Sequence, residues 1–291
     1  MAHPSLHSPD EAGEVLDLAG IETRRVVVRG LGHRVLTAGS GGPLVLLHGI
    51  AGSADELVGV LPRLAERYRV VAFDAPGHGL SDKPLDHRYD LGYYADSTLG
   101  LMDALGIQRA PLLAVSGSGP VALSLALAHP ERVSKLVLVD AAGLGREVSW
   151  SYRLATLPLA HHVFRRSVNR RSSEAFGRAL CYNPDRLPDG WVDRRLRIWA
   201  TPGAVEAFFL TVRAGLSLRG QRVTFAHRLG ELGQPTLLVW GRHDPIIPVA
   251  HAIAAAGAIP NARLCIFEAC GHMPPWEYPD EFAQTVLDFL G

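Results

Sequence analysis

The chain has 291 residues, of which 47% are hydrophobic and 20% are charged, as in ordinary globular proteins. Its 29 basic and 29 acidic residues cancel, so the chain as a whole lacks the positive charge typical of proteins that bind nucleic acid or acidic membranes. The three cysteines, Cys181, Cys265 and Cys270, have no spacing typical of a zinc site or a disulfide framework, which favours a reducing compartment.

Residues 1–21 form an N-terminal extension in our interpretation. They lack the cationic start and long apolar run of a secretory signal, and no apolar stretch in the chain is long enough to span a bilayer. We therefore expect a cytoplasmic protein.

The first predicted elements are two strands at 24–28 and 33–38, which the turn residues "RGLG" join into a hairpin. Six continuous apolar runs follow, a pattern typical of strands buried on both faces. They are "PLVLLHG", "RVVAFDAPG", "APLLAVSGS", "KLVLVDAAG", "PTLLVWGRHD" and "ARLCIFEACGH".

Amphipathic helices are predicted between these strands, near 54–67, 93–105, 117–129, 248–257 and 279–290. A hairpin followed by strand–helix alternation predicts an α/β fold with a mostly parallel sheet. Residues 144–228 break the alternation, because they show helical periods and many arginines but no convincing buried strand. We interpret them as a helical lid between the core segments 22–143 and 229–291. Its arginines fit a solvated helical surface better than an anion site.

Polar residues follow the predicted strands at the ends where α/β sheets bind their ligands. They are His48, Asp74, Ser116, Asp140, Asp244 and His272.

The stretch "LLAVSGSGPVAL" (112–123) contains two candidate nucleophiles. A nucleophile on a tight strand-to-helix turn needs small residues two positions to either side, because the two backbones approach closely there. Ser116 has Ala114 and Ser118 at those positions and directly follows the strand, whereas Ser118 falls inside the first helical turn. Ser116 is therefore favoured, although a serine turn that merely caps a helix remains the alternative.

Asp244 and His272 follow the last two strands, and the order Ser, Asp, His is the one expected for a triad on such a sheet. In a triad the histidine takes the serine proton and the acid orients the histidine ring. Asp140, one strand earlier, competes with Asp244 for the acid role. His243 is expected to pack locally.

The turn "LLHGIAGS" predicts an oxyanion hole made by the backbone N–H groups of Ile50 and Gly117. It does not fit a phosphate-binding loop, because no Gly-Lys-Ser/Thr follows. We predict no metal and no cofactor.

These motifs, together with "FDAPGHGLSDKP" and "GHMPPWEYPDEFAQTVLDFL", resemble the α/β-hydrolase superfamily over about 24–143 and 229–291. The resemblance implies a helical lid inserted after the sixth core strand. Related dehalogenases and epoxide hydrolases have aspartate where Ser116 stands.

Within that superfamily, "DAAGLG" and "CGHMPPWE" are similar to motifs of the meta-cleavage product hydrolases, which split carbon–carbon bonds. This resemblance implies substrate contacts at Arg194, at Trp276 and at Val115, the residue before the serine. That family has asparagine in place of Val115 and a glycine–proline loop in place of "IAGS". Both positions help to polarise its substrate.

The sequence therefore predicts a serine hydrolase that cleaves esters of small, largely apolar acyl groups. Carbon–carbon hydrolysis of dienone acids is the alternative, and a non-catalytic ligand-binding relative is a third possibility. The expected partner is a small-molecule substrate, with no nucleic acid and no membrane. The oligomeric state is left open, with a homodimer as one candidate.

Overall fold

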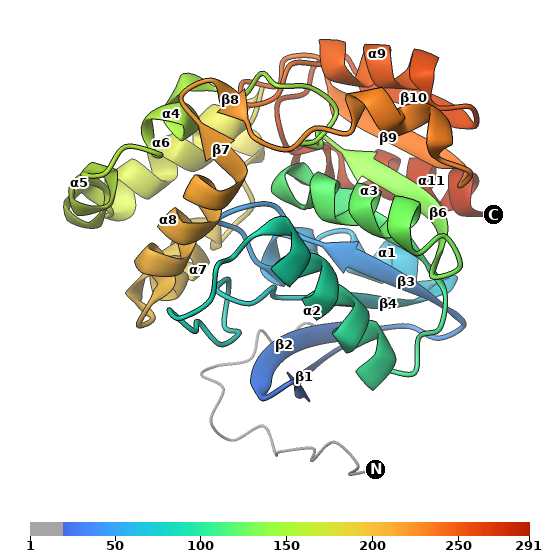
Figure 1. Ribbon diagram of the computed structural model, residues 1–291, viewed down its shortest axis with the longest axis horizontal. Coiled ribbons are helices and arrows are strands. Elements are labelled where there is room, and N and C mark those ends of the chain that lie inside the picture. Colours follow the sequence, from blue (N-terminus) through green and yellow to red (C-terminus); the bar gives the residue numbers. More distant parts are fainter. Residues whose placement is uncertain (1–19) are drawn as a thin grey trace.

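The computed structural model of the protein describes residues 20–291, in which an eight-stranded sheet has helices on both faces (Figure 1). The first two neighbouring pairs in the sheet are antiparallel and the others are parallel. The predicted α/β fold with a mostly parallel sheet is confirmed. In sheet order the strands are β1 (Ile21–Val28), β2 (Leu31–Ala38), β4 (Tyr68–Phe73), β3 (Gly42–Leu47), β5 (Ala110–Val115), β6 (Val133–Val139), β9 (Thr236–Gly241) and β10 (Ala262–Phe267).

The predicted hairpin is formed by β1 and β2, whose register pairs Val28 with Leu31. Its two loop residues, Arg29 and Gly30, both have positive φ angles, 50° and 83°. Such turns match the right-handed twist of the two strands, which explains the tight connection. β1 begins at Ile21, the last residue of the predicted N-terminal extension, and residues 1–19 lie outside the described part of the chain.

The central strands are buried on both faces, as their apolar runs predict: Leu112 and Leu113 of β5 and Leu136 and Val137 of β6 have no exposed surface. β10 differs from the prediction. It is an edge strand that pairs only with β9, and several of its residues reach solvent. The same apolar composition therefore occurs at the centre and at the edge of the sheet, so composition alone could not distinguish the two.

Four of the predicted helices are present within a few residues: α2 (Leu91–Ala104), α3 (Gly119–Ala128), α9 (Ala250–Ala258) and α11 (Pro279–Leu290). The helix expected at 54–67 is broken into a 3₁₀ turn, Ala54–Leu57, and the short α1, Leu61–Ala65. The break falls at the exposed Gly59, just before Pro62 in the first turn of α1. Figure 1 shows α2 and α3 on one face of the sheet and α1 and α11 on the other.

Between β6 and β9 the chain forms five helices, which we call the cap helices and which gather at one end of the sheet (Figure 1). Two strands of two residues each, β7 (Leu216–Ser217) and β8 (Gly220–Gln221), pair with each other and not with the main sheet. Within 20–291, no helix is both long enough and apolar enough to cross a membrane. The cap helices are α4 (Trp150–Leu154), α5 (Ala160–Ser167), α6 (Arg170–Leu180), α7 (Trp191–Ala200) and α8 (Ala204–Gly215).

Candidate active site

Ser116 lies at the sharp turn between β5 and α3. It begins a 3₁₀ turn, Ser116–Ser118, and has a positive φ of 52°, which is a strained conformation for a residue other than glycine. The Ala142 N–H donates to the Ser116 carbonyl over 2.9 Å and helps to hold this geometry. Strain that the surrounding fold maintains at one serine is typical of a nucleophile turn.

The second serine of the motif is used within the fold. Ser118 Oγ lies 2.9 Å from the carbonyl oxygen of Val115 and 3.0 Å from that of Leu47. The close approach expected of this motif occurs one residue later, where a Cβ on Gly119 would lie 2.4 Å from the Ala142 carbonyl oxygen. Serine is therefore accommodated at 118, where glycine is usual.

His272 lies between Ser116 and Asp244. Its Nε2 is 2.9 Å from Ser116 Oγ, and its Nδ1 is 2.8 Å from Asp244 Oδ2. The other Asp244 oxygen, Oδ1, accepts hydrogen bonds from the N–H groups of Ile246 (2.7 Å) and Ile247 (3.1 Å). The carboxylate is thereby fixed with one oxygen toward the histidine, and this geometry can support proton transfer from the serine hydroxyl.

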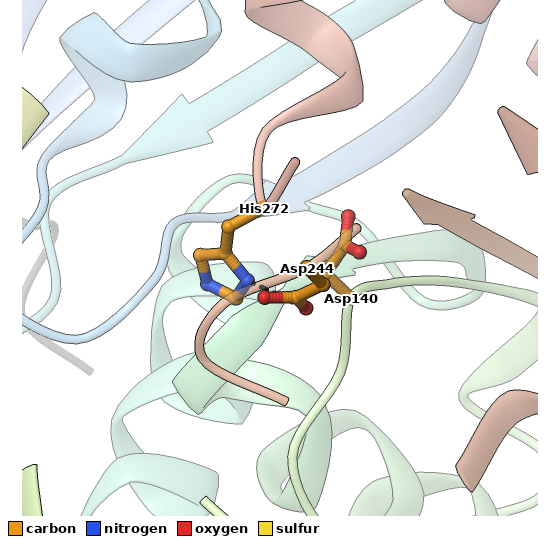
Figure 2. Close-up of side chains that lie close together, drawn as sticks. All are labelled: Asp140, Asp244 and His272. Carbon is orange, nitrogen blue, oxygen red and sulfur yellow. Dashed lines mark hydrogen bonds and ion pairs between the residues drawn. The ribbon is translucent and has the colours of Figure 1, made fainter. Parts of the chain in front are cut away.

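Asp140, the competing acid, lies behind Asp244 rather than against the histidine ring (Figure 2). It is completely buried after β6, has a positive φ of 44°, and accepts a hydrogen bond from the Gly241 N–H at 3.0 Å. Burial, together with the neighbouring Asp244 carboxylate, raises the pKa of Asp140 well above its usual range. This shift favours the protonated form of Asp140 and reduces the repulsion between two carboxyl groups that lie side by side.

Asp140, Asp244 and His272 could also be considered as metal ligands, because one possible ligand atom from each lies within 4.8 Å of the others. The atoms concerned already have partners: Asp244 binds His272 and two backbone N–H groups, and His272 bridges to Ser116. The raised pKa of Asp140 favours its protonated form, which would have to lose its proton to bind a metal. The donor set fits a hydrogen-bonded relay better than a cation site.

Glu277 holds the loop that carries His272. Its buried carboxylate accepts hydrogen bonds from the N–H groups of Gly271 (2.6 Å), Tyr182 (3.1 Å) and Asn183 (2.9 Å). The His272 N–H in turn donates to the Leu180 carbonyl at 2.7 Å. The sequence analysis did not single out Glu277, although its place in "GHMPPWE", close after His272, was a usable signal.

The two predicted oxyanion donors lie next to each other. A Cβ on Gly117 would lie 3.0 Å from the Ile50 nitrogen, and one on Gly49 would lie 3.2 Å from Ser116 Cβ. The Ile50 N–H has no backbone acceptor within residues 20–291, and the Gly117 N–H lies in the first turn of its helix, where such groups lack a partner. Both N–H groups are therefore available near Ser116 Oγ.

Ser116 opens into a cavity of about 120 Å³ between the sheet and the cap helices. No charged side chain of the described residues lines it. A smaller cavity of about 60 Å³ shares Gly117 and Ile50 with it as lining residues and is also lined by His48 and His78. The predicted oxyanion donors therefore lie in the wall common to two neighbouring cavities. The larger chamber is lined by apolar groups that include Val121, Val148, Tyr152, Leu216 and Ile246.

Tyr152 is shared with a further cavity of about 270 Å³ inside the cap helices, which Phe164, Phe176 and Phe208 also line. Tyr94 links α2 to α8, because its hydroxyl lies 2.7 Å from Thr211 Oγ1. Sequence analysis missed these wall residues, because apolar and aromatic residues at helical spacing give the same pattern whether they line a cavity or fill a core.

The three predicted substrate contacts do not line the Ser116 cavity. Val115 is buried at the end of β5. Trp276 donates from its indole nitrogen to the Glu56 carbonyl at 2.8 Å and packs edge-on against Trp191. Arg194 lies beside a separate small cavity. None of the three lines the Ser116 cavity, and substrate contact at these residues stays a prediction.

Two neighbouring arginines line this separate cavity. Arg194 and Arg195 both line it, together with Glu56, whereas Arg197 is exposed. Helix α7 packs against both α6 and α8, so a broad face of it is covered and two consecutive residues turn inward. Burial raises the pKa of Glu56 to about 8, an effect that the Arg195 charge opposes.

Arg195 is stacked among aromatic rings. Its guanidinium lies 4.5 Å from the ring centre of Phe176 and 5.2 Å from those of Trp191 and Trp199. Burial lowers its pKa. Trp191 and Trp199 stand four residues to either side of Arg195 on α7, and this spacing was a signal that could have distinguished it from Arg194.

The remaining polar residues at the strand ends have structural partners. Asp74 accepts hydrogen bonds from the N–H groups of Ala54 (2.7 Å) and Leu80 (2.8 Å). His48 Nε2 accepts from the Ala75 N–H at 3.0 Å. His243 is exposed and stacks on Tyr182, in keeping with local packing.

Comparison with known proteins gives concordant matches. Residues 42–279 match the family model described as the alpha/beta hydrolase fold. A 2-hydroxymuconate semialdehyde hydrolase of Pseudomonas sp. (strain CF600) is 30% identical over 92% of this chain and 93% of its own length. The structure is similar to that of a meta-cleavage product hydrolase from Pseudomonas fluorescens IP01, with 26% identity, a TM-score of 0.79 and coverage of 92% of this chain and 97% of the other. It is also similar to a bacterial membrane phospholipase A, with 28% identity, a TM-score of 0.77 and coverage of 94% and 86%.

Proposed function

Because this chain belongs to the α/β-hydrolase family, we propose that it cleaves carboxylic esters of small, largely apolar acyl groups through an acyl-enzyme on Ser116. One observation carries the choice of substrate: the cavity that contains Ser116 is apolar and has no charged side chain among its described lining residues. Such a chamber stabilises an apolar acyl group and disfavours a desolvated carboxylate.

In the proposed mechanism His272 Nε2 accepts the proton of the Ser116 hydroxyl as the oxygen attacks the ester carbonyl. Asp244 holds the Nδ1–H tautomer of His272 and stabilises the imidazolium that forms. The protonated histidine then gives its proton to the leaving alcohol. Water attacks the acyl-enzyme in a second cycle, with His272 again as the base, and releases the acid.

The negative charge that develops on the carbonyl oxygen is stabilised by the backbone N–H groups of Ile50 and Gly117, which lie next to each other beside Ser116. In this proposal the larger of the two neighbouring cavities holds the acyl group and the smaller one holds the alcohol. This division follows the two halves of an ester.

Carbon–carbon hydrolysis of a dienone acid is the second candidate. It is favoured by the relatives named for 2-hydroxymuconate semialdehyde and meta-cleavage products, and by the two partly buried arginines, Arg194 and Arg195. The same serine, histidine and aspartate would act in it. For a substrate carboxylate to reach either arginine, it would have to leave the Ser116 chamber for the neighbouring cavity.

The test compares neutral p-nitrophenyl esters of short acids with a 2-hydroxy-6-oxo-dienoate, with Ser116→Ala as the blank. We expect the esters to be the better substrates and Arg194→Ala to leave ester turnover nearly unchanged. Carbon–carbon hydrolysis would instead be supported if the wild type cleaves the dienoate efficiently and Arg194→Ala loses roughly 2–5 kcal/mol of transition-state stabilisation for that substrate.

A fluorophosphonate probe addresses the third possibility, a non-catalytic binding protein. We expect labelling at Ser116 that is lost in Ser116→Ala and largely kept in Ser118→Ala. Absence of labelling and turnover in the folded wild-type protein would favour a binding role, and labelling at Ser118 would contradict the assignment of the nucleophile.

A further inference from the structure

The outer surface of helices α4 and α5 carries a row of exposed apolar side chains, which we call the apolar ridge. The turns of residues 150–163 follow one another without a gap: the Leu157 N–H donates to the Leu154 carbonyl at 3.1 Å, and the Val163 N–H to the Leu159 carbonyl at 3.4 Å. The exposed apolar side chains are therefore carried by one continuous series of hydrogen-bonded turns. The members of the ridge are Trp150 (66% exposed), Leu154 (51%), Leu157 (40%), Leu159 (70%) and Val163 (67%).

The inner side of the same segment is apolar as well. Tyr152, Ala155 and Phe164 pack against the cluster formed by Trp199, Phe208 and their neighbours. A surface helix of a globular protein normally presents polar residues to water on its outer side. Apolar residues on both sides indicate that the outer side meets another apolar surface.

Positive charge accompanies the ridge. Between Glu147 and Glu174 the sequence contains five arginines and no aspartate or glutamate. Arg165 pairs with Glu206 and Arg170 with Asp193, while Arg166 and Arg171 are exposed and form no ion pair within the described part of the chain. The net charge of zero for the whole chain conceals this local excess.

From these observations we propose that the segment from Trp150 to Arg171 docks on an anionic lipid bilayer. Trp, Leu and Val side chains enter the boundary between headgroups and acyl chains, and the arginines contact anionic headgroups, as in amphipathic segments that lie in a membrane surface. The charge also argues against symmetric pairing with a second copy, because such pairing would bring two excesses of positive charge together.

The docking segment also lines the interior spaces of the site. Tyr152 lines the Ser116 cavity, and Tyr152, Ala155 and Phe164 line the larger cavity inside the cap helices. An apolar ester dissolved in the bilayer would therefore meet the protein at the helices that enclose its binding space. This delivery role rests on the proposed esterase function, whereas docking itself does not.

The test is co-flotation of the full-length protein with vesicles of phosphatidylcholine alone and of phosphatidylcholine mixed with phosphatidylglycerol. We expect binding to the anionic vesicles, weakened by salt and at least tenfold weaker for Leu159→Glu/Val163→Glu. The charge variant Arg166→Glu/Arg171→Glu is expected to lose binding to a similar extent. The matched control is Ile253→Glu, which removes another half-exposed apolar residue, from α9, and should bind as the wild type does.

All five positions substituted in these variants lie at the exposed surface, so unchanged unfolding temperatures would show that the variants are folded. Flotation with Ser116→Ala separates docking from catalysis, because that variant should still bind vesicles. Failure of the wild type to bind anionic vesicles, or binding that survives both double variants, would overturn the proposal. So would a dimer in light scattering that Leu159→Glu/Val163→Glu converts to a monomer.

Discussion

Replacing Asp244 by asparagine should reverse the proton pattern of His272 while leaving the shape of the site intact. In the structure Asp244 Oδ1 accepts two backbone N–H groups, from Ile246 at 2.7 Å and Ile247 at 3.1 Å, and Oδ2 faces His272 Nδ1 at 2.8 Å. An asparagine must keep its side-chain oxygen toward the two backbone N–H groups, because a flipped amide would place its NH₂ group against these backbone donors. Its NH₂ group then faces His272 Nδ1 and makes that nitrogen an acceptor.

A histidine that accepts at Nδ1 carries its proton on Nε2, 2.9 Å from Ser116 Oγ, and cannot take the serine proton. Reversing the asparagine would give up two hydrogen bonds from buried backbone donors, each costing about 1–3 kcal/mol, and would add repulsion between facing N–H groups. The productive state is thus disfavoured by roughly 4–5 kcal/mol, so kcat should fall by about 10³- to 10⁴-fold.

The assay is hydrolysis of a p-nitrophenyl ester at pH 7, with Asp140→Asn as the matched control. Asp140 accepts the Gly241 N–H through one oxygen, and burial favours its uncharged form, so asparagine can reproduce this hydrogen bond without a charge. We expect less than a tenfold loss from this control. A larger loss for Asp140→Asn than for Asp244→Asn, with both proteins folded by circular dichroism, would refute the reasoning and assign the acid to the end of β6.

Gly117→Ala should place a methyl group within 2.9–3.0 Å of Ile50, displace its N–H donor and lower kcat by up to about 10²-fold with little change in KM, as steady-state kinetics would measure. Glu277→Ala leaves three backbone N–H groups without their acceptor and should lower the free energy of unfolding by about 3–5 kcal/mol, measured in urea; a loss below 1 kcal/mol would contradict this. Burial raises the pKa of Glu56 from 4.5 to about 8. Between pH 4.5 and 8 the unfolded chain therefore releases a proton that the folded protein retains, so Glu56 lowers the free energy of unfolding as the pH rises. Glu56→Gln should therefore raise the unfolding temperature more at pH 8 than at pH 5, and an equal effect at both would count against it.

The sequence by itself determined the features that depend on local order along the chain. Strand–helix alternation predicted the sheet, and the positions of Ser116, Asp244 and His272 in the turns that follow strands predicted that they would meet. The ends of neighbouring parallel strands lie at one edge of a sheet, so residues distant in sequence converge there without any detail of packing. The imperfect motif around Ser116 could be interpreted because a strand ran directly into it.

The tertiary structure alone decided which side chains share a space. Arg194 and Arg195 are adjacent in sequence, yet only the packing of α7 between its neighbours shows that both turn inward, away from the Ser116 cavity. The raised pKa of Asp140 likewise depends on its burial and on the carboxylate of Asp244, a residue 104 positions later that the fold brings beside it. Cavity walls, edge positions and protonation states depend on contacts between distant segments, and these contacts leave no periodic trace in the sequence.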